Sequence, residues 1–473
     1  MNQRDKRVTL KSRIRALWIV MIAALLVGCG GDASKNTTSP ISLDPTPFGG
    51  VVRPENAIDI SIIYAPESDQ YMPQVIADFN SAYANGRNPL TEQPLASGER
   101  PIYVTGGPPT ASKSSGDVTQ GIVNAVIAPN NANVERPTMF APSVSHWLTL
   151  ANYNSGRQIF DLSEAQPTAL APVVIAIWES RLRAIQETVG YEDIGWEELL
   201  DVLHSPNGWA DYGIPNGRRA VYYGHANPIN SSTALSALIE EFYACARQNG
   251  FTGRRLSAQE INVPEVQQCV RDIEELVRHY ARRTEDLLLY IPQGPDYLDF
   301  VAMEEVDVID LNQGDLDYLA AGQTFQLPER LIAVYPKEGT FWHEHPIGIV
   351  NAEWVTDEQR EAARVFTDYV LTPEVQTLIM SFGFRPANPD VQLGFPFVEE
   401  NGVSPDGPTT VLDVPTQDAL IAIQQSWTLV RKQADVLLLI DVSGSMEDEN
   451  KIGIAREAAV AFLENMEPTN RVA

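Results

Sequence analysis

The class of fold is decided by the stretch IDISIIYAPES at residues 58–68. Within residues 58–64, apolar and polar residues alternate at first, and an apolar run follows. This pattern is typical of a buried strand. The next four residues, 65–68, are typical of a loop, and apolar residues recur at helical spacing over residues 72–83. The stretch therefore predicts a strand, a loop and a helix in succession.

The succession of strands and helices continues along the chain. Residues 102–104 predict a second strand, residues 118–126 a helix, and residues 139–141 a short third strand. Ser143 and Ser145 then open another expected helix. Strands that alternate with helices predict βαβ units and a mainly parallel α/β sheet. In such sheets, ligands bind beyond the carboxyl ends of the strands.

A section of different composition follows an apolar strand expected at residues 172–178. Within it, NPINSST at residues 227–233 comes directly before a predicted helix over residues 234–247. Hydroxyl side chains at this position cap the first turn of a helix, or they hold a polar ligand at the exposed N–H groups. The sequence leaves both roles open. Further helices are expected over residues 266–283 and 297–305.

The sequence AARVFTDYVLTPEVQ at residues 362–376, followed by GFRP at residues 383–386, resembles the C-terminal signature of bacterial extracellular solute-binding proteins. The resemblance is strongest to those of the molybdate-binding, type II kind. It implies a two-lobed, type II periplasmic-binding-protein-like α/β fold over residues 58–430. A small ligand would bind in the cleft between the lobes, which closes around it.

The resemblance also implies the lobe boundaries and the ligand residues. Residues of about 58–172 and 346–430 would form the first lobe, and residues 173–345 the second. The implied ligand-binding residues follow strands or open helices: Ser68, Ser143, Ser145, Ser231, Ser232 and Tyr297.

A second informative stretch is DVLLLIDVSGSM at residues 435–446. Its apolar run, residues 436–440, predicts a strand that is buried on both faces. The loop that follows offers the side-chain oxygens of Asp441, Ser443 and Ser445, which suit Mg²⁺ or another divalent cation held partly by water.

With a helix expected over residues 452–466, this stretch resembles the start of a von Willebrand factor type A domain. The metal-ion-dependent adhesion site of that family opens with Asp-x-Ser-x-Ser at the end of the first strand. The resemblance implies the first strand and helix of a truncated, Rossmann-like type A domain over residues 435–473. Such a domain would bind a protein partner through the metal ion.

The first 28 residues predict a lipoprotein signal peptide. A cluster of Lys and Arg precedes an apolar segment, residues 16–27, that is shorter than a membrane-spanning helix. The sequence LVGC at residues 26–29 then resembles a bacterial lipobox, which implies that Cys29 is lipidated and anchors the chain to the membrane outside the cytoplasm. Residues 29–57 are expected to form a flexible linker.

Charge and cysteine content limit the possible partners and the possible disulfides. A formal net charge of -28 argues against nucleic acid as a partner. Once Cys29 is lipidated, Cys245 and Cys269 remain. Outside the cytoplasm these two residues could form a disulfide, and separate buried thiols are the other possibility.

Three functions follow from these features. The favoured one is a lipid-anchored, extracytoplasmic, non-enzymatic protein that binds a small solute and, through the type A domain and its metal, a protein partner. The second is a conventional ABC-transporter receptor in which the type A domain is a scaffold. The third is an envelope metallohydrolase that holds Zn²⁺ with His343, Glu344 and His345, because residues two apart on a strand share a face.

Overall fold

The computed structural model describes residues 51–473 except residues 107–112, 132–133, 216–219, 279, 316–325, 434, 465, 467–470 and 473. The predicted signal peptide, Cys29 and most of the predicted linker lie outside the described residues. None of the helices that are described has the length and apolar character needed to cross a membrane.

The first lobe is built on a four-stranded sheet with the order β2-β1-β3-β9. Its strands are β1 (Ile58–Tyr64), β2 (Ile102–Thr105), β3 (Met139–Ala141) and β9 (Gly348–Ile349). β1 pairs in parallel with β2 and β3, and β9 runs antiparallel to β3. Its helices are α2 (Met72–Ala84), α3 (Ser115–Ile127), α4 (His146–Ser155), α12 (Asp357–Val370) and α13 (Pro373–Ser381).

The second lobe is built on a sheet with the order β5-β6-β4-β7. Its strands are β4 (Ala171–Trp178), β5 (Tyr223–Gly224), β6 (Phe300–Glu304) and β7 (Leu331–Val334), with β8 (Trp342–His343) paired to the start of β4. β4 is antiparallel to β6, β7 and β8, and only β5 and β6 are parallel. The prediction of a mainly parallel sheet therefore applies to the first lobe and is wrong for the second. The reason is that β4 enters the second sheet from the first lobe and runs against its neighbours.

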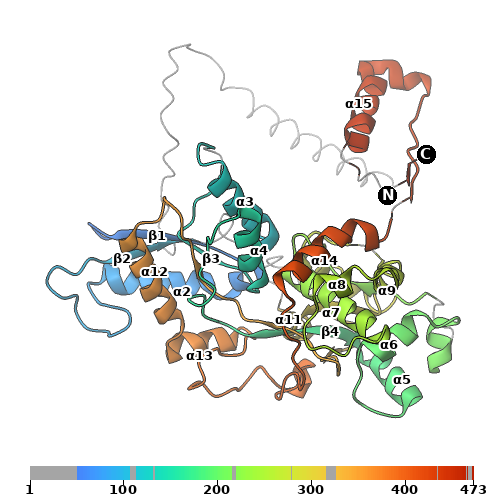
Figure 1. Cartoon of the computed structure of the whole chain (residues 1–473), viewed down its shortest axis with the longest axis horizontal. Coiled ribbons are helices and arrows are strands. Elements are labelled where there is room, and N and C mark those ends of the chain that lie inside the picture. Colours follow the sequence, from blue (N-terminus) through green and yellow to red (C-terminus); the bar gives the residue numbers. More distant parts are fainter. Residues whose placement is uncertain are drawn as a thin grey trace, which may run out of the picture. The chain divides into compact units, whose positions relative to one another are not determined.

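Eight α-helices among the described residues accompany this second sheet. They are α5 (Glu179–Val189), α6 (Trp196–Leu203), α7 (Ser232–Gln248), α8 (Ala258–Ile261), α9 (Pro264–Glu274), α10 (Thr284–Leu288), α11 (Glu305–Gln313) and α14 (Gln417–Val430). α14 packs against α7, α8 and α9 (Figure 1). The assignment of all of residues 346–430 to the first lobe is therefore wrong for its last part. The apolar face of α14, which includes Leu420, Ile423 and Trp427, is buried in the core that α7 and α9 share.

The helix expected over residues 297–305 is also wrong. Residues 300–304 form β6, a fully buried strand beside β4, and the helix α11 begins only at Glu305. A short apolar run fits a buried strand and a buried helix equally well, so its periodicity does not distinguish the two.

Cys245 and Cys269 form a disulfide, with their Cα atoms 5.8 Å apart. The bond joins α7 to α9. Of the two possibilities that the sequence leaves open, the structure has the paired one.

The C-terminal segment contains β10 (Asp435–Val436), a 3-10 helix η6 (Gly444–Asn450), α15 (Lys451–Glu464) and β11 (Arg471–Val472). β10 pairs in parallel with β11. The prediction of a doubly buried strand over residues 436–440 is wrong here, because Leu437 and Leu439 are 65% and 86% exposed. A strand is buried on both faces only when other elements cover both, and β10 has a single two-residue partner among the described strands.

Candidate ligand cleft and hinge

The two lobes meet along a small polar cavity of about 10 Å³, which is about the volume that one water molecule needs. Its walls come from the loop after β1 and the N-termini of α3, α7 and α10. The lining residues are Pro66, Glu67, Ser114, Ser115, Ser143, Asn230, Ser231, Ser232, Arg283, Thr284 and Glu285. The cavity therefore lies beyond the carboxyl ends of β1 and β3, where ligands bind in sheets of this kind.

Three of the residues expected to bind a ligand line this cavity, namely Ser143, Ser231 and Ser232. Ser231 accepts a hydrogen bond from the backbone N–H of Ala234 at 3.2 Å and so caps α7. Ser232 accepts one at 2.9 Å from the indole N–H of Trp147, which belongs to the first lobe. Both roles that the sequence left open for these hydroxyls, capping and facing a polar cavity, are compatible with their positions.

The other three expected ligand residues do not line the cavity. Ser68 is buried beside it, with its hydroxyl 3.1 Å from that of Tyr71. Ser145 uses its backbone N–H to hydrogen-bond Glu344 at 3.0 Å. Tyr297 accepts a hydrogen bond at its carbonyl from Arg278 at 2.6 Å, and its ring packs against the same guanidinium. Tyr297 was placed at the start of a helix that the structure does not contain.

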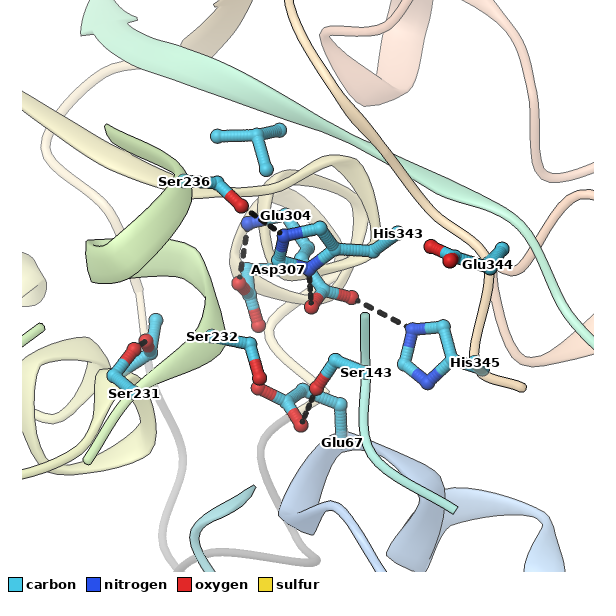
Figure 2. A network of polar contacts seen from close by, with 12 residues as sticks. Glu67, Ser143, Ser231, Ser232, Ser236, Glu304, Asp307, His343, Glu344 and His345 are labelled. Carbon is cyan, nitrogen blue, oxygen red and sulfur yellow. Dashed lines mark hydrogen bonds and ion pairs between the residues drawn. The ribbon is translucent and has the colours of Figure 1, made fainter. Parts of the chain in front are cut away.

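Two buried carboxyl groups face the cavity, one from each lobe. Glu67 follows β1 and is 5% exposed, and Glu285 lies in α10 and is 4% exposed. The Glu67 carboxyl accepts a hydrogen bond from Ser143 at 3.1 Å (Figure 2). Burial raises the pKa of Glu67, and the charge of Glu304 raises it further. Burial likewise raises the pKa of Glu285, with Glu67 as the next cause.

The edge of the cavity holds the lobes together through α3. The backbone N–H of Gly116 donates to the Asn230 carbonyl at 3.1 Å. Asp117 accepts from the Asn230 amide at 2.8 Å and from the Arg282 guanidinium at 2.6 Å. A Cβ atom on Gly116 would lie 2.0 Å from the Ile229 carbonyl oxygen, so only glycine allows this approach of the two backbones.

Behind the cavity, residues at the end of β6 and in and after β8 form a buried ionic network. Glu304 lies between two imidazoles, with Oε1 2.6 Å from His343 Nδ1 and Oε2 3.1 Å from His345 Nε2 (Figure 2). The other ring nitrogen of His343, Nε2, lies 2.8 Å from the hydroxyl of Ser236. We call Glu304, His343 and His345 the hinge cluster.

The pKa values of the hinge cluster reflect this pairing. Burial would raise the pKa of Glu304, but the positive charges of His345 and His343 and their hydrogen bonds outweigh burial and lower it to about 2. Burial would lower the pKa of His345, but the Glu304 charge outweighs it and raises the value. The network is thus a carboxylate shared by two imidazoles.

The zinc site expected at residues 343–345 is not formed. The carboxyl of Glu344 accepts a hydrogen bond from the backbone N–H of Ser145. His343 and His345 each bind a different oxygen of Glu304 instead. Because β8 ends at His343 and His345 has a φ of 41°, the alternation of a regular strand is lost between the two histidines.

The three oxygens expected to bind a metal in the C-terminal segment are close together. The Ser443 hydroxyl donates to Asp441 at 3.1 Å and lies 3.2 Å from the Ser445 hydroxyl, and the Ser443 backbone N–H donates to Asp441 at 2.7 Å. Hydrogen bonds from the backbone and side chain of Ser443 lower the pKa of Asp441. All three residues are exposed.

Sequence reasoning missed several residues of the cleft and hinge. Glu67 is the direct neighbour of Ser68 in a loop expected to face the ligand, so the loop could have indicated it. Ser114 and Ser115 open α3 within a Ser-rich and Gly-rich loop, as N-cap positions often do. The sequence around Glu285 and Glu304 does not mark them as site residues, because their roles depend on burial in the folded protein.

A protein-family model and several solved structures are similar to parts of this chain. The family model described as bacterial extracellular solute-binding protein matches residues 192–403. The matched residues include Ser231, Ser232, Glu285 and the hinge cluster. No curated protein matches the chain.

Several solved structures are similar in fold. The sulfate-binding protein SubI from Mycobacterium tuberculosis is 16% identical with a TM-score of 0.45, and the match covers 78% of this chain and 96% of that one. A periplasmic thiamin binding protein is 12% identical with a TM-score of 0.48, covering 80% and 96%. The ferric binding protein from Campylobacter jejuni is 12% identical with a TM-score of 0.45, covering 78% and 98%.

Proposed function

We propose that this chain is an extracytoplasmic, non-enzymatic receptor that captures a small polar solute between its two lobes. The family match over residues 192–403 supports a solute-binding function and a place outside the cytoplasm. The observation that carries the proposal is the pair Glu67 and Glu285, since each lobe contributes one buried carboxyl to the same cavity. A ligand held by both carboxyls would favour the closed arrangement of the lobes.

The chemistry of the cavity indicates which solutes fit. Its lining offers carboxyl and hydroxyl oxygens, while the one cationic group, Arg283, is paired with Asp286 at 2.8 Å. An anion would gain no new ion pair from this lining and would oppose ionisation of both carboxyls. An ammonium group or several hydroxyl donors would pair with the same oxygens. We therefore infer a cationic or polyhydroxylated organic solute in preference to an oxyanion.

A binding screen tests this proposal. The full chain, purified without refolding, would be tested by thermal shift and calorimetry against amines, polyols, sugars, sulfate and molybdate. We expect binding by amines or polyols that is weakened at least tenfold in Glu67→Gln and Glu285→Gln, because each variant removes a carboxylate acceptor. Glu358→Gln is the matched control, since Glu358 pairs with Arg100 on the surface. Tight sulfate or molybdate binding would contradict the inferred ligand class.

We further propose that Cys29 carries the lipid anchor and that the segment from residue 435 onward belongs to a type A domain. The close approach of the Asp441, Ser443 and Ser445 oxygens supports a site for Mg²⁺ or another divalent cation, through which a protein partner would bind. Asp441→Ala should abolish cation-dependent partner binding and leave solute binding unchanged. Partner binding that persists in excess chelator would contradict the metal-bridged part.

A conventional ABC-transporter receptor is the second candidate, with the type A segment as a scaffold. The family match over residues 192–403 favours it as strongly as the first. The two candidate functions differ in the partner that the chain would bind. A transport receptor would bind a membrane permease in a solute-dependent manner and would not require the Asp441 site. Pull-down of a permease by wild type and Asp441→Ala alike would favour the receptor.

A further inference from the structure

The second lobe contains another buried cluster, which lies apart from the cleft. His225 follows β5, Glu241 lies in the middle of α7, and Glu274 is the last residue of α9. All three are fully buried. One ligand atom from each residue lies within 4.8 Å of the others. We call these three residues the α7–α9 cluster.

The imidazole of His225 is oriented as a metal ligand would be. Its Nδ1 lies 2.7 Å from the backbone carbonyl of Ala226, and since a carbonyl only accepts, Nδ1 carries the proton. In the neutral ring, Nε2 then holds a lone pair, and it lies 3.1 Å from Oε2 of Glu274. A backbone carbonyl that fixes one ring nitrogen while the other binds the ion is the usual arrangement of metal-bound histidine.

Oε2 of Glu274 accepts a hydrogen bond from the Tyr280 hydroxyl at 2.7 Å, but the other carboxyl oxygens of the pair are less well satisfied. Within the part of the chain that the structure describes, neither oxygen of Glu241 has a hydrogen-bond partner, and neither does Oε1 of Glu274. The nearby Tyr223 hydroxyl is likewise buried without a partner among those residues. Buried polar atoms are nearly always satisfied, so an acceptor-rich group of this kind points to a proton or a cation between the carboxyls.

We propose that the α7–α9 cluster binds one divalent transition-metal ion of the Zn²⁺ type, through His225 Nε2 and carboxylate oxygens of Glu241 and Glu274. Imidazole with carboxylates suits this class of ion, whereas Mg²⁺ and Ca²⁺ prefer oxygen ligands alone. Two ligands of a tetrahedral Zn²⁺ ion, each ~2.1 Å from the metal, lie ~3.4 Å apart. The 3.1 Å separation of His225 Nε2 from Glu274 is close to that value.

The surroundings indicate a structural ion. The Cys245–Cys269 disulfide joins the same two helices that carry Glu241 and Glu274. The ring of Trp427 in α14 packs against those of His225 and Tyr280, so the cluster is covered from that side. A bound ion would therefore cross-link β5, α7 and α9 within a closed site, as structural zinc does.

Metal analysis of the full chain tests this proposal. Because the site is closed, protein would be produced with and without added Zn²⁺ and purified without chelator, and its metal content and thermal unfolding would then be measured. We expect one Zn²⁺ per chain and a Tm several degrees above that of the metal-free protein. Glu241→Gln should fold normally, because it removes a buried carboxylate that lacks a partner, but it should lose both the Zn²⁺ and the Tm increase.

Two control variants locate the ion. Asp441→Ala removes the carboxylate of the C-terminal oxygen cluster, and His343→Gln removes one imidazole of the hinge cluster. Asp441→Ala should keep the Zn²⁺ and the Tm increase, and His343→Gln, which lowers the overall stability by breaking the hinge cluster, should still keep the Zn²⁺. Wild-type protein without Zn²⁺, or a Tm increase that survives in Glu241→Gln, would overturn the proposal; the first result would mean that the two carboxyls share a proton.

Discussion

The hinge cluster and the cleft both contain buried carboxyl groups, but they differ in how these groups are satisfied. In the hinge cluster, one carboxylate has two imidazole partners, and the pKa of Glu304 falls to about 2. In the cleft, neither Glu67 nor Glu285 forms an ion pair with another described residue, and their pKa values rise. The same residue type therefore has a lowered pKa in one place and a raised pKa in the other.

This difference separates a structural role from a binding role. A buried charge pair resists change, since removing one partner leaves the other unpaired in a medium of low dielectric. A neutral buried carboxyl can donate or accept a hydrogen bond, and it ionises when a cation arrives. The hinge cluster thus fixes the connection between the lobes, and the cleft keeps groups available for a ligand. The predictions below test this contrast, from the largest expected effect to the smallest.

Glu304→Gln should produce the largest loss of stability, ~3–5 kcal/mol in the free energy of unfolding, because it removes the carboxylate shared by His343 and His345. The Glu304 contribution is present above the unfolded pKa of ~4.3 and is lost as the pH falls toward about 2. The raised pKa of His345 adds stability that is lost as the pH rises through it. Urea unfolding across pH should therefore show the largest difference between variant and wild type in mildly acidic solution.

Glu344→Gln is the control for this prediction. Glu344 lies between the two histidines in sequence, but its carboxyl accepts a hydrogen bond from the backbone N–H of Ser145. Its replacement should cost ~1 kcal/mol or less. Equal losses in the two variants would mean that the Glu304 network has no special role in the hinge.

Gly116→Ala should prevent full closure of the cleft. The added Cβ would lie 2.0 Å from the carbonyl oxygen of Ile229 on the other lobe, so the lobes must separate. We expect a larger radius of gyration by small-angle scattering and solute affinity at least tenfold weaker. Gly121→Ala on the same helix has nothing within 4 Å of its Cβ and should behave as wild type. An unchanged radius in Gly116→Ala would contradict the close approach of the lobes.

Glu67→Gln should reveal a neutral carboxyl in the cleft. With a raised pKa, Glu67 favours the folded state fully below the unfolded pKa of ~4.3, and this contribution declines as the pH rises toward its folded value. Glutamine resembles the protonated form, so the variant should equal wild type near pH 4 and exceed it near pH 8, with a slope difference of up to ~1.4 kcal/mol per pH unit. If the free energies of unfolding of the variant and the wild type instead differ by the same amount from pH 4 to pH 8, the pKa of Glu67 is not raised in the folded protein.

Asp117→Asn should have the smallest effect. Its carboxylate joins Asn230 and Arg282 across the cleft, but the pair is exposed, with Arg282 at 68% and Asp117 at 41% side-chain exposure. We expect a loss of ~0.5–1 kcal/mol in the closing equilibrium, which falls further in high salt. Asp59→Asn, which breaks a surface pair with Arg53 within the first lobe, should leave closing unchanged.

The sequence predicts the parts of this molecule that depend on local pattern. Alternation and apolar runs predict β1, β3 and β4, and the hydroxyls at residues 231 and 232 mark the N-terminus of α7. Prediction from the sequence fails where tertiary contacts decide which element forms and where it packs. Residues 300–304 join a sheet although their short apolar run also fits a helix, and α14 packs on the second lobe although it follows segments of the first.

The candidate site divides in the same way. Ser143, Ser231 and Ser232 stand where strands end or helices begin, so position along the chain indicates them. Glu67, Glu285 and the pairing of Glu304 with two histidines depend on residues brought together from both lobes, some separated by hundreds of positions. No local spacing encodes such pairs, and only the assembled fold shows which carboxyls are paired and which face the cavity.

The measurement that tests the central claim most directly is native mass spectrometry of the chain purified without refolding, for the wild type and for Glu285→Gln. The account predicts a small organic molecule, rich in amine or hydroxyl groups, bound to the wild type and reduced or missing in the variant. Bound sulfate or another oxyanion would contradict it, and so would equal occupancy by the same solute in both proteins, because Glu285 would then not be part of the binding site.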